Sequence, residues 1–201
     1  MKKLFLLAVL ALALPTAVFA SSNIDYTNGG GTLSGSKGGL ELSGSALIAV
    51  NGSGGLITGS DLGNVSFETG ALTSGSLQQG GTFAAGGWFT ITGNGTNGVP
   101  SGTLFTGTFS GPVTWTMMTL SNGTHNYTLT GTLAGTGSGY SSVGVTVQLT
   151  VNTGKGFFNG CTRISSGDTN VNVVVPEPGS LSLLGTGLIA LGGTIRRKLK
   201  A

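Results

Sequence analysis

Few side chains of this sequence could move protons, attack a substrate or hold a metal. His125 is the only histidine, and the turn-like residues around it (121–126) predict a solvated loop histidine rather than a general base. A zinc site needs more His or Cys ligands than one histidine and the single cysteine, Cys161, supply. The sequence therefore predicts no metal site, no cofactor and no enzymatic activity.

The carboxylates of the central region are scattered along the chain. A pair such as Glu41 and Glu68 has the residue types of a glycosidase, which needs two carboxyl groups flanking the bond it breaks, but nothing in the sequence places the two together. Gly154-Lys155-Gly156 lacks the upstream glycine and the following Ser or Thr of a phosphate-binding loop, so it predicts a turn. Cys161 cannot close an intramolecular disulfide; it is a small residue of a strand or turn, or a bridging thiol.

Charge is low and unevenly placed. Only 7% of residues are charged, and the formal charge of +3 comes from cations at the two ends. Residues 21–175 contain three cations and five carboxylates, a net charge of −2. Nucleic acid is excluded as a partner, because neutralising phosphates requires clustered Lys and Arg.

The elements that must position these residues are strands. Apolar residues alternate with Thr or Gln in the segments 113–117, 127–133 and 143–151, which is the period of two of a half-buried strand. Further strands are predicted at 40–50, 65–72, 88–92, 104–109 and 171–175. One apolar and one hydroxyl-rich face per strand favours an antiparallel sheet over one core.

Asn-Gly pairs separate many of these strands. They occur at Asn51, Asn94, Asn97, Asn122 and Asn159, and such pairs tolerate the positive φ of tight hairpin turns. The sequence thus predicts an all-β fold, an antiparallel β-sandwich or barrel-like meander. The 39 glycines leave a disordered, low-complexity stalk as the alternative.

The first 20 residues have the pattern of a secretory signal peptide. Lys2 and Lys3 precede an apolar run over 4–14, and small residues end the segment. Cleavage is expected between Ala20 and Ser21. The Sec translocon and signal peptidase are therefore expected partners.

The last 27 residues combine a proline motif, an apolar run and a basic end. The run over 181–195 measures about 22 Å as a helix, which makes a short transmembrane helix once its ends are included. Its membrane-facing residues are Leu181, Leu183, Leu184, Leu188, Ile189, Leu191 and Ile195. The stop-transfer cations, which stay in the cytoplasm, are Arg196, Arg197, Lys198 and Lys200.

Pro176, Glu177 and Pro178 stand directly before this run, and the two prolines keep the segment extended and accessible. Motif, apolar helix and basic cluster occur in the order and spacing of the PEP-CTERM sorting family, which this chain resembles. The resemblance implies that Pro176, Glu177 and Pro178 are recognised by a membrane-embedded exosortase, and that the host makes exopolysaccharide.

Three segments follow: a signal peptide (1–20), a Gly- and Thr-rich β domain (21–174) and a PEP-CTERM sorting and anchor segment (175–201). The expected function is that of an exported envelope or extracellular-matrix protein with a structural or adhesive role. It would be anchored transiently in the inner membrane and then reach the cell surface or the extracellular space, with exopolysaccharide as a further partner. An exported carbohydrate-binding or carbohydrate-active protein is the alternative, which a loss of binding on changing Trp88 or Trp115 would favour. A simple anchored stalk without processing is a further alternative.

Overall fold

The computed structural model describes residues 21–52, 54–138 and 140–174. Within these residues every regular element is a strand, and all strand pairs are antiparallel. The strands are β1 (Ser21–Gly29), β2 (Thr32–Ser36), β3 (Gly39–Gly52), β4 (Gly55–Glu68), β5 (Leu72–Ser76), β6 (Gly80–Phe83), β7 (Gly86–Asn94), β8 (Ser101–Phe109), β9 (Val113–Thr119), β10 (His125–Gly137), β11 (Tyr140–Asn152), β12 (Cys161–Arg163) and β13 (Ser166–Val174). The predicted all-β antiparallel fold is confirmed, whereas the predicted signal peptide and transmembrane helix lie outside the described residues.

The strands form a ring of hydrogen-bonded neighbours. The order β11-β13-β1-β3-β4-β7-β8-β10 returns to its start through the pairing of β10 with β11. Of the two predicted forms, the ring corresponds to the barrel-like one. Closure matters physically because a closed sheet leaves fewer unpaired backbone edges than an open one.

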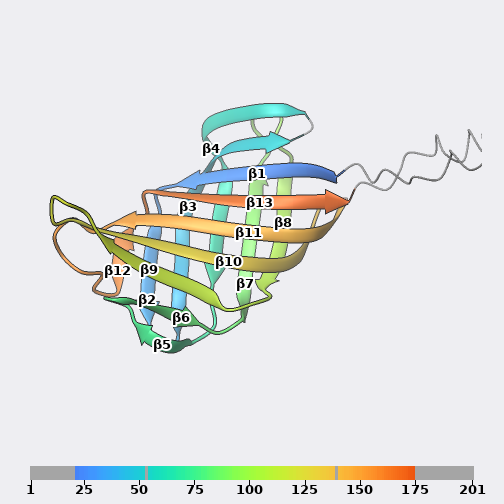
Figure 1. The fold of residues 1–201 in the computed structure, drawn as a ribbon. Helices are drawn as coiled ribbons and strands as arrows, with labels where there is room; N and C mark the ends of the chain where they lie inside the picture. Colours follow the sequence, from blue (N-terminus) through green and yellow to red (C-terminus); the bar gives the residue numbers. More distant parts are fainter. Residues whose placement is uncertain (1–20, 53, 139, 175–201) are drawn as a thin grey trace, which may run out of the picture. The chain divides into compact units, whose positions relative to one another are not determined.

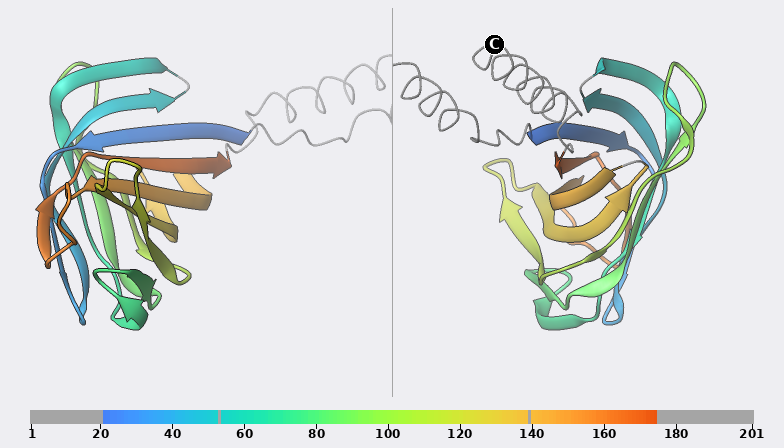
Figure 2. Two further views of the ribbon diagram at one scale, coloured as in Figure 1. Left: turned by 60° about the vertical axis from the view of Figure 1, so that its left-hand side comes forward. Right: turned by 90° about the vertical axis from the view of Figure 1, so that its right-hand side faces the viewer.

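The ring is flattened into two layers, as Figure 1 shows. Strands β1, β13, β11 and β10 run across one layer, while β7, β8, the first half of β3 and the last half of β4 cross behind them. The end of β3 and the start of β4 bend to run alongside β1. Figure 2 shows the two layers from the side. The layers join where β1 pairs with β3, next to a bulge at Thr27 and Asn28, and where β8 pairs with β10.

Two branches leave the ring at β3 and β10. Along one edge, each of these strands pairs with a branch strand over its first half and with its ring neighbour over its second half. The first half of β3 pairs with β2, which in turn pairs with β12. The first half of β10 pairs with β9, followed by β6 and β5. These branches extend the sheet around the lower end of the core in Figure 1.

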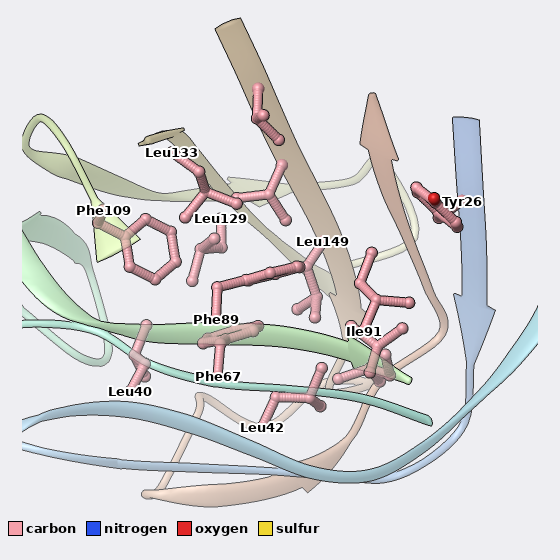
Figure 3. Close-up of a cluster of buried hydrophobic side chains, with 14 of the residues drawn as sticks. Tyr26, Leu40, Leu42, Phe67, Phe89, Ile91, Phe109, Leu129, Leu133 and Leu149 are labelled. Carbon is pink, nitrogen blue, oxygen red and sulfur yellow. The ribbon is translucent and has the colours of Figure 1, made fainter. Parts of the chain in front are cut away.

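The core contains many aromatic rings. Phe67 stacks on Phe89 with centroids 5.9 Å apart, and Phe109 meets both rings edge-on. Figure 3 shows these rings between aliphatic side chains from the other layer, including Leu129 and Leu149. Each fully buried ring or leucine stabilises the fold by roughly 1.5–3 kcal/mol relative to an exposed one, so the alternation of the strands accounts for much of the stability.

Glycine is required at one of the layer junctions. Gly135 of β10 lies opposite Gly107 of β8. A Cβ added at Gly135 would lie 2.2 Å from the Thr106 carbonyl oxygen and 2.6 Å from the Gly107 Cα. The two strands therefore pack more closely than any side chain would allow.

The longest predicted strands are confirmed with small shifts at their ends. The segment predicted at 65–72 is wrong at both ends, because β4 begins at Gly55 and stops at Glu68, after which Thr69 bonds to Leu40 of β3. The strands β1, β2, β5, β6 and β12 were not predicted, because Gly, Ser and Asn interrupt the alternation in the first four and β12 has only three residues. Positive φ occurs at Gly95, Gly98, Gly123 and Gly160 of the Asn-Gly pairs, whereas Gly52 continues β3.

Among the described residues, no helix has the length and apolar character needed to cross a membrane.

Candidate functional site

Three side chains with binding chemistry lie in one row on the outer face of the sheet. Glu41 of β3 is the direct cross-strand partner of Glu68 of β4, and Glu68 is the partner of Trp88 of β7. On the other side of Glu41, the row continues with Ser34 of β2. All four point away from the core, because their chain neighbours Leu33, Leu42, Phe67 and Phe89 are buried. We call Glu41, Glu68 and Trp88 the outer row.

The indole of Trp88 is exposed and its N–H has a hydrogen-bond partner on the neighbouring strand. Its Nε1–H donates a hydrogen bond of 3.2 Å to Oε2 of Glu68. The side chain nevertheless remains 41% exposed, in contrast to the buried Phe89 beside it. Trp88 therefore offers an exposed aromatic surface to a ligand, beside a carboxylate that accepts hydrogen bonds.

A small hollow lies next to the carboxylates. It has a volume of about 210 Å³ and is lined by Glu41, Glu68 and the residues Ser34, Gly35, Ser36, Gly38 and Gly39 of β2 and its turn. Gly39 has a φ of 151°, and a Cβ there would lie 2.7 Å from the Thr69 carbonyl oxygen. The lining thus offers hydroxyl, carboxylate and backbone groups and contains no apolar side chain.

A larger hollow of about 520 Å³ lies on the outer face of the other layer. Asp25 of β1 lies opposite Asn170 and diagonal to Asp168. Threonines of β9, β10 and β11 also line the hollow, together with Pro112, Gly131, Val147 and Gln148. Partial burial raises the pKa of the Asp25 carboxyl, and the nearby Asp168 carboxylate raises it further. This hollow has no aromatic lining residue.

His125 is not the solvated loop residue that the sequence predicted. It begins β10, is buried, and its ring stacks on Phe157 with centroids 4.4 Å apart. Its Nδ1 lies 3.0 Å from the Thr119 hydroxyl. The predicted turn is present at residues 121–123, but His125 lies just after it, in β10, where its backbone pairs with Thr153 and Gly154.

Trp115 and Cys161 have different surroundings. Trp115 is buried, its Nε1–H donating to the Leu77 carbonyl oxygen at 2.9 Å, so it offers no surface to a ligand. Cys161 is an exposed free cysteine of β12, opposite Ser34. Residues 153–156 form the turn predicted around Gly154-Lys155-Gly156.

Within the described part of the chain, no three His, Cys, Asp or Glu side chains come together as a metal site would require. The sequence does not reveal that the three residues of the outer row are neighbours, because only the register of β3, β4 and β7 brings them together. The predicted cleavage point falls at the edge of the described residues: Ser21 begins β1, and Ala20 lies outside. The sorting, membrane-helix and stop-transfer residues (176–200) also lie outside.

Comparison with known proteins gives one match. Residues 174–198 match the family model of the PEP-CTERM protein-sorting motif. The match confirms the resemblance seen in the sequence and implies an exported protein that is sorted through the membrane by an exosortase. No curated protein and no solved structure matches the chain.

Proposed function

We propose that the protein is a structural or adhesive component of the cell envelope or extracellular matrix, delivered there by exosortase processing of its tail. The Sec translocon and signal peptidase would act first, and the body would be held at the inner membrane before it reaches the surface or the extracellular space. The protein would act through its location outside the cell and would convert no substrate.

The observation that carries this proposal is the position of the sorting motif relative to the fold. The motif match begins at Val174, the last residue of β13. Val174 is the cross-strand partner of Ser21, where the mature chain is expected to begin. Removing both terminal segments at these points would leave the β1–β13 ladder intact, so processing costs the body none of its strand pairs.

The outer surface of the body also supports a non-catalytic role. Threonine, serine and asparagine side chains cover the outward positions of the strands; an example is the row formed by Thr132, Thr146 and Asn170. These groups form hydrogen bonds with water and with hydroxyl-rich polymers. They are weak acids and weak bases at neutral pH, so they do not suit acid–base catalysis. A hydrated matrix suits such a surface.

The test is mass spectrometry of the mature protein from its own host. We expect a mass that ends near Pro178, and a variant with Pro176, Glu177 and Pro178 all replaced by Ala should keep the whole tail. Pro112→Ala, at an exposed proline of the body, is the matched control and should be processed normally. An intact tail on the wild-type protein in the envelope fraction would contradict the proposal.

A second measurement addresses turnover. Neutral glucans incubated with the mature protein should show no new reducing ends. Hydrolysis that is abolished by Glu41→Gln or Glu68→Gln would instead make the outer row a glycosidase centre.

A second candidate function is carbohydrate binding, which the outer row favours because it combines an exposed aromatic ring with hydrogen-bonding groups.

A further inference from the structure

We infer that the outer row, together with its neighbouring hollow, binds a neutral polysaccharide, with Trp88 as the stacking platform and Glu41 and Glu68 as hydrogen-bond acceptors. The inference rests on the proposed export, since only a body outside the cell meets such polymers.

The exposed ring of Trp88 is the first argument. A pyranose ring has an apolar face of C–H groups that packs on an aromatic ring and removes both from water. The indole Nε1–H donates a hydrogen bond to Glu68, and 41% of the side chain stays accessible. The ring is therefore available to a ligand without rearrangement.

The paired carboxylates are the second argument. Like charges directly opposite each other on adjacent strands destabilise a sheet, yet Glu41 and Glu68 occupy such positions. A local rule is most often broken where function requires it. Sugar hydroxyls donate hydrogen bonds to carboxylates, and such charge-assisted bonds are stronger than those between neutral groups.

The negative charge of the site determines which kind of polysaccharide it can bind. The two carboxylates repel an anionic polymer, and the body as a whole, residues 21–174, carries more carboxylates than cations. Among the described residues, no third His, Cys, Asp or Glu joins the two carboxylates. A neutral polymer fits these constraints best.

The shape of the site favours a chain over a small molecule. Small-molecule pockets enclose most of their ligand, whereas the outer row lies on an exposed sheet face beside a hollow of about 210 Å³. One sugar unit would lie on Trp88 and the next would reach the hollow, where Ser34, Ser36 and backbone groups are available. The larger hollow at Asp25 lacks an aromatic platform and is the weaker candidate.

Affinity electrophoresis of the mature, processed protein tests the inference. Gels would contain dextran or laminarin as neutral glucans, or alginate as an anionic polymer. We expect retardation by at least one neutral glucan, insensitive to added salt, and none by alginate. Trp88→Ala should weaken the apparent affinity by about tenfold or more, as truncation of an aromatic binding residue does. Trp88→Phe, which keeps a ring, should retain part of the affinity.

Leu56→Ala provides the matched control, because Leu56 is another exposed large side chain, 66% exposed, on a part of β4 away from Glu68. It should bind like the wild type, and circular dichroism should show the same strand content for each variant. Glu41→Gln and Glu68→Gln should each weaken binding severalfold.

Three results would overturn the inference: no retardation of the wild type by either glucan, retardation of the wild type by alginate, or equal retardation of Trp88→Ala and wild type by the glucan. None of them affects the mass of the processed tail, so failure of the binding site remains distinguishable from failure of the sorting proposal.

Discussion

Trp88 and Trp115 are both strand residues flanked by Thr, Phe or Gly, yet they lie in opposite environments. Trp88 is 41% exposed on the outer face of β7, and its indole N–H bonds to a carboxylate. Trp115 is 1% exposed, stacks on Tyr127 with centroids 5.0 Å apart and meets Phe158 edge-on. Each indole N–H has an acceptor, but only one ring has a free face.

The difference shows that residue type alone does not identify a binding residue in this chain. On a strand, side chains point alternately to the two faces, so the position of each tryptophan relative to its buried neighbours decides its environment. Around Trp115 the sheet branches β9 and β6 and the loop before β12 enclose the ring. No described residue covers the ring of Trp88 completely. Trp115 therefore contributes to stability, whereas Trp88 is available for binding.

The largest expected effect is that of Trp115→Ala. The change removes a buried ring and leaves the Leu77 carbonyl oxygen without its donor. We expect the free energy of unfolding to fall by about 3–5 kcal/mol, as for other large-to-small core substitutions. Denaturant titration of the mature protein measures this loss. If the alanine variant does not fold, Trp115→Phe provides the measurement, and its loss should be smaller. A loss below about 1 kcal/mol would remove the distinction between the two tryptophans.

Thr169→Val should act in the opposite direction. Thr169 is fully buried in β13, and its hydroxyl has no hydrogen-bond partner among the described residues. Valine has nearly the same shape without the polar atom, so we expect stabilisation by about 1 kcal/mol in the same titration. Thr146→Val, at an exposed threonine of β11, should change stability by less than about 0.5 kcal/mol. Destabilisation by Thr169→Val would indicate that the hydroxyl has a partner after all.

Trp88→Ala should barely alter stability. The hydrogen bond to Glu68 is exposed to water, and exposed polar interactions contribute little. We expect a change in the free energy of unfolding within about 1 kcal/mol. A loss as large as that of Trp115→Ala would show that Trp88 is a core residue and would weaken its assignment to a binding surface.

The smallest effect is expected for Asp25→Asn, and it depends on pH. The pKa of Asp25 is raised in the folded protein by burial and by Asp168, so the folded state holds the proton more tightly than the unfolded state. The wild type therefore loses stability as the pH rises through this raised pKa, and the variant should lose less. The effect is small because water screens a partly exposed pair. Denaturation curves from about pH 3 to pH 7 would show it, and parallel pH profiles for the two proteins would contradict it.

Much of the fold could be predicted because period-two alternation is a local property. The run Val145, Val147, Leu149 and Val151 is buried as expected, with Thr146 and Gln148 on the outer face. The partners of these strands could not be predicted. Bulges in the β3–β4 pair between Leu42 and Ser45 and between Leu47 and Ala49 shift the register by amounts that no count along the chain reveals. That register sets Glu41 against Glu68.

The sequence by itself determined the sorting tail. Such a tail is a contiguous segment that processing machinery recognises from its own residues, so order and spacing along the chain suffice to identify it; the signal peptide over the first 20 residues stays a prediction. The match at 174–198 agrees with that for the tail. The tertiary structure alone decided the closure of the ring, the burial of His125 and Trp115, and the alignment of Glu41, Glu68 and Trp88 in one row. These features depend on hydrogen bonds between strands distant in sequence, whose register is fixed only when the whole core packs.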